Sequence, residues 1–304
     1  MKRTGHSVRW KVLPAACAVA ALASMACGCG GPGTGADKPL VYAGIPPHAY
    51  LVQRIAGDAV ECRVLLPPGA SPAMYDPTPA QMSDLGRAAV YVRSGVPFEE
   101  AIWDKIRDAN RAMRVVDTQA GVALRAMESH EHEGENHGGH EGGRPDPHVW
   151  LVPGNAAIAA KAVCEALQAV DPEHSTQYAE NLDGLLAELD ALDAELASIL
   201  KPLQGKEFWV FHPAWGYFAD AYGLKQRSIE AEGKEPGPQS MGRLVDEMKA
   251  EGVRVVFYDP QFSARQAEVL AKEVGAEVQE LNPMAEDYAE NLRAAARAIA
   301  GAAS

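Results

Sequence analysis

The sequence has little basic charge for its length. Among its 304 residues, 28 are Lys or Arg and 41 are Asp or Glu, which gives a formal net charge of −13. An acidic surface of this kind repels phosphate backbones, so we expect no nucleic-acid partner. The same charge raises the local concentration of cations. Hydrophobic residues make up 47% of the chain, which is enough to form the cores of two domains of ordinary size.

Cysteine is also scarce, and the chain has no disulfide framework. Of the five cysteines, only Cys62 and Cys164 lie in the part of the chain that we expect to fold. Cys62 falls in an expected strand and Cys164 in an expected helix, and the sequence gives no reason to pair them. We therefore predict two unpaired, buried thiols.

Long apolar runs are absent, and the longest covers residues 12–26. This run is short for a membrane span, but it follows a basic start and suits a secretory signal peptide over residues 1–26. It ends in small residues beside Cys27 and Cys29, which resembles a bacterial lipoprotein cleavage site. We predict export, with lipidation of Cys27 or Cys29 anchoring the protein to a membrane surface. The alternative is an ordinary cleaved signal peptide. The Gly-rich stretch 27–38 predicts a flexible tether.

Strand-like apolar runs alternate with helical patterns, which predicts βαβ units and mainly parallel sheets. We expect helices to begin near Pro47, Thr78 and Pro97. The strands fall into two sets, which predict an α/β N-terminal lobe over 39–170 and an α/β C-terminal lobe over 204–304. The expected strands are 40–45, 60–66, 89–93 and 115–117 in the first set, and 208–211, 253–258 and 278–281 in the second.

A long helix is predicted between the lobes, over residues 171–203. Asp171 and Pro172 suit a helix start, and leucines recur from Leu182 to Leu200 at spacings of three and four. A helix of this length would act as a rigid spine that joins two lobes with a ligand cleft between them. A coiled-coil dimer is the rival interpretation, but the pattern covers few heptads, and we expect a monomer.

A low-complexity insert occupies residues 128–143. It contains His130, His132, His137 and His140 among Glu, Gly and Asn. These residues cannot form a core, but imidazoles at such spacings can capture zinc, nickel or copper. The alternative is a solvated polar loop without a ligand.

Two further histidines lie in more ordered contexts. His148 follows Asp146, which is placed to orient the imidazole ring or to cap the turn. His212 directly follows the expected strand 208–211, and the carboxyl ends of parallel strands face the ligand crevice of α/β sheets. Each histidine alone is more often structural, but the pair in two separate lobes points to a metal site.

These residues belong to a longer series of short motifs whose order and spacing are specific. The motifs cover residues 43–47, 68–72, 75–79, 95–99, 146–150, 211–218, 259–262 and 282–284. Together they resemble the metal-binding solute-binding proteins of bacterial ABC importers for zinc and manganese, the ZnuA/TroA-like family. The resemblance implies two α/β lobes, a long rigid helix and a metal buried in the cleft between the lobes. It also implies an ABC permease as partner.

The resemblance assigns two metal ligands and leaves the others open. His148 and His212 match the family's second and third ligands, whereas Ala73 stands at the first ligand position and Asn282 at the position where some members have aspartate. We expect His48, in the turn after the first strand, to replace the first ligand. The alternative interpretation is that His48 is a partly exposed histidine at a helix end.

The candidate carboxylate ligands are Glu230, at the end of the segment 226–230, and Asp259, which follows the apolar run 253–258, and we favour Glu230. Each could instead be an ion-pair or capping residue.

The predicted function is the capture of zinc outside the cytoplasmic membrane and its delivery to an ABC permease, without an enzymatic reaction. The same architecture could carry manganese, nickel or a metal chelate, because Ala73 and Asn282 remove ligating groups. A zinc hydrolase with Glu230 as general base is less favoured, since the chain has no His-Glu-x-x-His or Gly-x-Ser-x-Gly motif. A lipid-anchored adhesin is a fourth alternative.

Overall fold

The computed structural model describes residues 38–128, 144–230 and 236–303. The signal peptide, Cys27 and Cys29, and all four histidines of the insert lie outside these residues. Lys38–Ser304 form one compact unit. In the described part of the chain, no helix has the length and apolar character that crossing a membrane requires.

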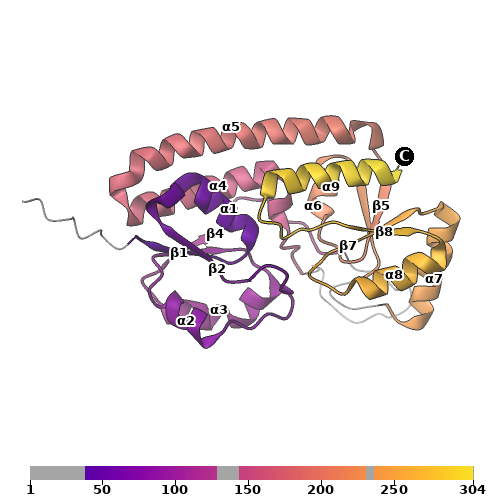
Figure 1. Cartoon of the computed structure of the whole chain (residues 1–304), viewed down its shortest axis with the longest axis horizontal. Helices are drawn as coiled ribbons and strands as arrows, with labels where there is room; N and C mark the ends of the chain where they lie inside the picture. Colours follow the sequence, from indigo (N-terminus) through magenta and orange to yellow (C-terminus); the bar gives the residue numbers. More distant parts are fainter. Residues whose placement is uncertain (1–37, 129–143, 231–235, 304) are drawn as a thin grey trace, which may run out of the picture. The chain divides into compact units, whose positions relative to one another are not determined.

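The N-terminal lobe is built on a parallel sheet in the order β2-β1-β3-β4. Helices α1 and α4 contact the strands on the face that carries α5, and α2 and α3 pack together on the other side (Figure 1). Thr78 and Gln81 form a capping box that starts α2. The lobe's elements are β1 Leu40–Ala43, α1 Pro46–Ala56, β2 Glu61–Val64, α2 Pro79–Leu85, β3 Val90–Arg93, α3 Pro97–Ala109, β4 Arg114–Asp117 and α4 Pro153–Val170.

The C-terminal lobe repeats this arrangement with a parallel sheet in the order β6-β5-β7-β8. Its elements are β5 Glu207–Val210, α6 Gly216–Ala221, β6 Lys225–Ser228, α7 Pro238–Glu251, β7 Val255–Tyr258, α8 Ala264–Val274, β8 Glu277–Glu280 and α9 Tyr288–Ala303. The prediction of two α/β lobes with parallel sheets is therefore confirmed. In both sheets the strand order reverses beside the central strands, where α/β sheets form their ligand crevice.

Strand β6 was not among the predicted strands, because its sequence, Lys225–Ser228, contains no apolar residue. Its inward-facing side chains, Gln226 and Ser228, are nevertheless buried. The Gln226 side-chain oxygen accepts a hydrogen bond of 2.6 Å from the backbone N–H of Trp215. Polar residues can form this edge strand because neighbouring groups satisfy them in the fold.

Helix α5, Ser175–Leu200, is the long helix and spans 26 residues, about 39 Å at about 1.5 Å per residue. It is shorter than the predicted segment 171–203, because Pro172–His174 and Lys201–Leu203 form 3-10 turns at its two ends. The Asp171 carboxylate accepts hydrogen bonds from His174 and Tyr178, which stabilises the first of these turns.

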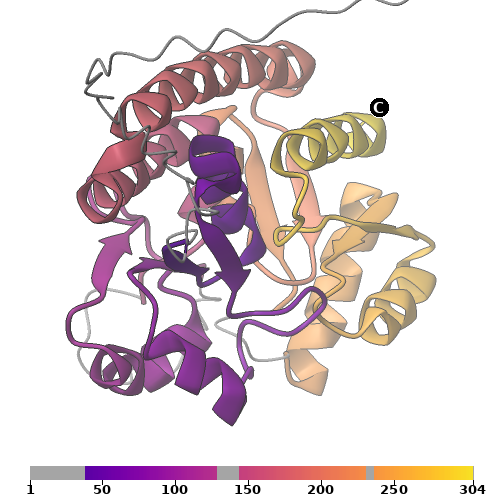
Figure 2. The same cartoon turned by 60° about the vertical axis from the view of Figure 1, so that its left-hand side comes forward.

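The leucines of α5 pack on both lobes. Helices α4 and α1 of the N-terminal lobe and α9 of the C-terminal lobe contact the helix (Figures 1 and 2). Its buried leucines are Leu185, Leu189, Leu192, Leu196 and Leu200. Ion pairs of 2.7 Å join the helix to Arg54 of α1, through Glu188, and to Arg293 of α9, through Glu195. The helix therefore fastens the lobes together.

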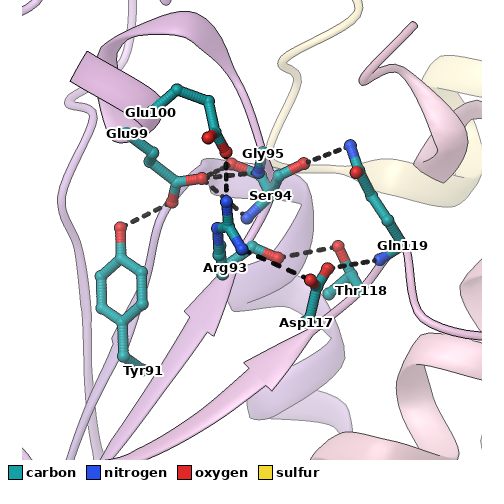
Figure 3. A network of polar contacts seen from close by, with 9 residues as sticks. All are labelled: Tyr91, Arg93, Ser94, Gly95, Glu99, Glu100, Asp117, Thr118 and Gln119. Atoms are coloured by element: carbon teal, nitrogen blue, oxygen red, sulfur yellow. Dashed lines mark hydrogen bonds and ion pairs between the residues drawn. The ribbon is translucent and has the colours of Figure 1, made fainter. Parts of the chain in front are cut away.

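A buried carboxylate organises the N-terminal lobe at the end of β3 (Figure 3). Glu99 accepts hydrogen bonds from the Tyr91 hydroxyl at 2.6 Å, the Ser94 N–H at 2.8 Å, the Ser94 hydroxyl at 2.7 Å and the Gly95 N–H at 2.7 Å. A Cβ atom at Gly44 would lie 1.8 Å from the Glu99 Oε1 atom. Glu99 therefore packs directly against the turn that leads from β1 to His48.

The two cysteines of the folded part are free, as predicted. Cys164 is buried and Cys62 is partly buried. Burial raises the pKa of the Cys62 thiol to about 12, so the group is a neutral thiol at physiological pH.

Candidate metal centre

His148 is held by the carboxylate two residues before it. The Asp146 Oδ1 atom lies 3.0 Å from the backbone nitrogen of His148 and 2.7 Å from its ring Nδ1, and it accepts both hydrogen bonds. Both residues are buried. Since Nδ1 is hydrogen-bonded to Asp146, the Nε2 atom of His148 is the nitrogen available to a metal ion.

His212 follows β5 in the C-terminal lobe, and its ring has a similar arrangement. Its Nδ1 lies 3.3 Å from the Oε2 atom of Glu230, which follows β6. The His212 ring packs on Phe262 with ring centroids 4.7 Å apart. The rings of His148 and His212 meet nearly edge to face, with centroids 5.4 Å apart. The structure thus brings together the two histidines and Glu230.

His48 lies in the first turn of α1 and is completely buried. Neither of its ring nitrogens has a hydrogen-bond partner among the described residues. Burial lowers the pKa of this imidazole to about 3, so the ring is neutral at physiological pH. The Trp150 ring contacts both His48, at a centroid distance of 5.8 Å, and His148, at 5.2 Å. The alternative of a partly exposed His48 is therefore wrong, because the residue is 0% exposed.

Asp259 directly follows β7 and is buried. Like Glu230, which follows β6, it lies at the carboxyl end of a strand of the C-terminal sheet. Its side chain is 2% exposed, and its Oδ2 atom has no hydrogen-bond partner in the described part of the chain. The pKa of Asp259 is raised from 3.8 to about 7, chiefly by burial, while a charge at His212 acts to lower it and the charge of Glu230 acts to raise it. Asp259 is therefore electrostatically coupled to the His212–Glu230 pair. Sequence alone gave no sign that this oxygen lacks a partner, because that depends on what surrounds it.

Asn282 and Ala73 occupy the positions at which the resemblance expects other ligands. The Asn282 side-chain oxygen accepts hydrogen bonds from the Gln261 side chain at 2.8 Å and from the backbone N–H of Met284 at 3.0 Å. Asn282 therefore stabilises its own loop. Ala73 is exposed, and its backbone N–H donates to the Ser71 hydroxyl.

A complete ligand shell is not assembled in this structure. Among residues 38–128, 144–230 and 236–303, no three His, Cys, Asp or Glu side chains form a group that could hold a metal ion. The geometry instead gives a close pair of imidazoles, a carboxylate at one edge of each ring, and two further buried groups, His48 and Asp259, with ring nitrogens and an oxygen that lack partners among the described residues. Side chains would have to move to bring four ligands to one ion.

The model of a protein family, described as "Zinc-uptake complex component A periplasmic", matches residues 41–302. The match covers β2 to β8, all of β1 except Leu40, and all of the candidate ligands described above. The chain belongs to the ZnuA family.

Individual relatives agree with this assignment. The chain is 29% identical over 252 residues to the high-affinity zinc uptake system protein ZnuA of Bacillus subtilis, covering 82% of this chain and 79% of that protein. It is 30% identical to ZnuA of Paracoccus denitrificans, covering 87% and 92%. A crystal structure of a ZnuA deletion mutant with zinc bound superimposes with a TM-score of 0.80 at 38% identity, covering 88% of this chain and 99% of that one. The predicted fold and family are both confirmed.

Proposed function

We propose that this protein captures zinc outside the cytoplasmic membrane and delivers it to an ABC permease, without catalysing a reaction. The pairing of His148 and His212 carries the proposal. The two imidazoles come from different lobes, their centroids lie 5.4 Å apart, and each has a carboxylate within 3.3 Å of its Nδ1 atom. In this position Asp146 would orient a metal-bound His148 and make it a better ligand. Membership of the ZnuA family supports the same function.

His48 is the proposed third ligand, in place of the histidine that Ala73 replaces. A buried imidazole with both nitrogens unpaired is costly, and a metal ion would satisfy one of them. Glu230 is the proposed carboxylate ligand. Asp259 is a second candidate for that role, because its Oδ2 atom is buried without a partner.

Zinc is the favoured cargo because neutral imidazoles with one carboxylate suit zinc better than manganese, which prefers oxygen ligands. Competition binding with Zn²⁺, Mn²⁺ and Ni²⁺ at equal concentrations tests this choice. We expect zinc to displace both other ions. Displacement of zinc by manganese or nickel would instead make that ion, or a chelate of it, the cargo of this cleft.

Equilibrium dialysis of metal-free protein tests the site itself. The insert contributes four more histidines, so the measurement uses a chain that lacks residues 129–143. We expect this chain to bind one zinc ion tightly and the His148→Ala/His212→Ala double variant to lose that ion. His174→Ala is the matched control, because the His174 side chain is 45% exposed and pairs with Asp171, which is not a candidate ligand. An unchanged affinity in the double variant would reject the proposal.

Native mass spectrometry of protein purified without added metal separates the remaining ligands. We expect one zinc per chain in the wild type and its loss in His48→Ala. Glu230→Gln and Asp259→Asn then distinguish the two carboxylates, and we expect the Glu230 variant to lose more zinc. Zinc retained by the His48 variant would exclude that residue as the substitute ligand.

We further propose that the chain acts as an exported monomer anchored through a lipid on Cys27 or Cys29. The basic start and apolar run of residues 1–26 support export, and the two cysteines after it supply the acceptor. Labelling of cells with a radioactive fatty acid tests the anchor in Cys27→Ser and Cys29→Ser variants. Loss of label in one of the two variants is expected, whereas an unlabelled wild type would indicate an ordinary cleaved signal peptide.

A further inference from the structure

Two short segments pair at the position where the insert leaves and rejoins the N-terminal lobe. Ala126 and Pro145 form an antiparallel bridge. The Met127 N–H donates to the Arg144 carbonyl, and the Asp146 N–H donates to the Arg125 carbonyl, both at 2.9 Å. The second segment continues directly into His148. The paired segments therefore connect Arg125 to the proposed metal ligand through a single residue, Asp146.

A tyrosine from the other lobe is hydrogen-bonded to both paired segments. Tyr217 belongs to α6 of the C-terminal lobe, five residues after His212. Its hydroxyl oxygen accepts a hydrogen bond of 3.0 Å from the backbone N–H of Arg125. The same hydroxyl donates to the Asp146 carbonyl at 3.1 Å. The segment that carries His148 is thus joined to the segment that carries His212.

The Arg125 guanidinium lies among three carboxylates. Its nitrogens are 3.8 Å from Asp146 Oδ2, 3.4 Å from Asp220 Oδ2 and 3.5 Å from Glu128 Oε1. Asp220 lies on α6, so this ion pair also crosses between the lobes. The two oxygens of Asp146 have different partners, because Oδ1 accepts from the His148 ring whereas Oδ2 faces Arg125. The Nη1 atom of Arg125 has no hydrogen-bond partner among the described residues, so Arg125 acts through its charge on the carboxylate that orients His148.

Gly216, the first residue of α6, makes room for this arginine. A Cβ atom at Gly216 would lie 1.2 Å from the Nη1 atom of Arg125, and the nearest three atoms all belong to the Arg125 side chain. An alanine there would displace the guanidinium, which is the movable end of a long side chain. Gly216 lies four residues after His212. Arg125 thus contacts the segments that carry both proposed ligands.

We propose that Arg125 is a positioning residue that sets the orientation of His148 by holding Asp146, and that it takes this position only when α6 of the other lobe packs beneath it at Gly216. The inference rests on the proposed function, because it gives Arg125 a role in metal binding. The contact between the two lobes would then directly affect the orientation of His148. Movement of α6 away from Arg125 would loosen His148 and so favour metal release.

Two variants from opposite lobes test the proposal. Arg125→Ala removes the guanidinium, whereas Gly216→Ala displaces it without removing any charged side chain. We expect each to weaken zinc binding at least about tenfold, in the range seen when groups that support metal-bound histidines are removed. Arg125→Lys should restore part of the affinity, because it keeps the charge but lacks the planar fork. Arg111→Ala is the matched control, since the Arg111 side chain is 84% exposed and forms an ion pair with Asp108 of α3.

The visible absorption spectrum of the Co²⁺-loaded protein gives a second readout, because it reports the geometry of the ligands and not the stability of the fold. We expect both Arg125→Ala and Gly216→Ala to change this spectrum, and Arg111→Ala to leave it unchanged. If His148→Ala abolishes zinc binding while both test variants keep the wild-type affinity and spectrum, the role of Arg125 is rejected and the metal site stands. If His148→Ala and His212→Ala together leave zinc binding intact, the proposed function itself fails.

Discussion

Two buried carboxylates, one in each lobe, have opposite surroundings. Glu99 in the N-terminal lobe accepts four hydrogen bonds, two of them from backbone N–H groups. Asp259 in the C-terminal lobe is equally buried, yet one of its oxygens has no partner among the described residues. Burial raises the pKa of both groups. A carboxylate with its hydrogen bonds satisfied stabilises a fold, whereas one left unsatisfied destabilises the empty protein and is available to a cation.

The largest effect is expected for Glu99→Ala. This change leaves the backbone N–H groups of Ser94 and Gly95 buried without acceptors, and hydrogen bonds to charged groups contribute about 1.5–3 kcal/mol each. We expect the free energy of unfolding to fall by about 3–6 kcal/mol. Urea denaturation of the metal-free protein measures the loss. A loss below about 1 kcal/mol would mean that water replaces Glu99 and that the two carboxylates do not differ as described.

Asp259→Asn should raise the free energy of unfolding of the metal-free protein, whereas Glu99→Ala lowers it. The pKa of Asp259 is about 7 in the fold against 3.8 ordinarily, so the folded state favours the proton. Stability from this group is fully present below about pH 4 and is lost as the pH rises toward 7. The neutral asparagine avoids that loss, so we expect equal stability at pH 4 and a gain of about 2–4 kcal/mol at pH 8, since one pKa unit corresponds to about 1.4 kcal/mol.

Thermal or urea unfolding of both proteins at the two pH values checks this expectation. Repeating the measurement with zinc present tests whether Asp259 binds the metal. If Asp259 binds the metal, the variant gains less from zinc than the wild type does, and the difference at pH 8 shrinks or reverses. A variant that is less stable than the wild type at pH 8 without metal would contradict the assignment of Asp259 as an unsatisfied group.

His48→Phe tests the second unsatisfied group and should have a smaller effect near neutral pH. The pKa of His48 is about 3 in the fold and about 6.5 when unfolded, so the folded state excludes the proton. Stability from the neutral ring is present above about pH 6.5 and is lost as the pH falls toward 3. At pH 5 the wild type should have lost about 2 kcal/mol through this residue, and the phenylalanine variant should not show that part of the loss.

Urea midpoints at pH 5 and pH 7 provide the measurement, with His174→Phe as the control. His174 is 45% exposed and lies outside the core of either lobe. An identical decline between pH 7 and pH 5 in wild type and His48→Phe would show that His48 reaches a proton acceptor or solvent in the native protein.

The two α/β lobes, the long helix and the likeness to a metal-binding family could all be predicted from the sequence. These follow from local patterns: apolar runs of strand length, leucines at helical spacing, and short motifs in a fixed order. The positions of His148 and His212 could also be predicted, because a residue that ends a parallel strand or starts the next helix faces the crevice. Strand β6 could not be predicted, since its polar residues are buried only through partners elsewhere in the chain.

The contacts among the candidate groups could not be predicted in this way, because they form only in the folded protein. Glu230 reaches the Nδ1 edge of His212, the ring nitrogens of His48 and one oxygen of Asp259 are buried without partners among the described residues, and Arg125 fits over Gly216 from the other lobe. Each of these facts depends on residues that are distant in the chain and meet only in the folded protein. Burial and hydrogen-bond satisfaction are properties of a packed surrounding, and short-range sequence patterns do not specify which distant groups will provide it.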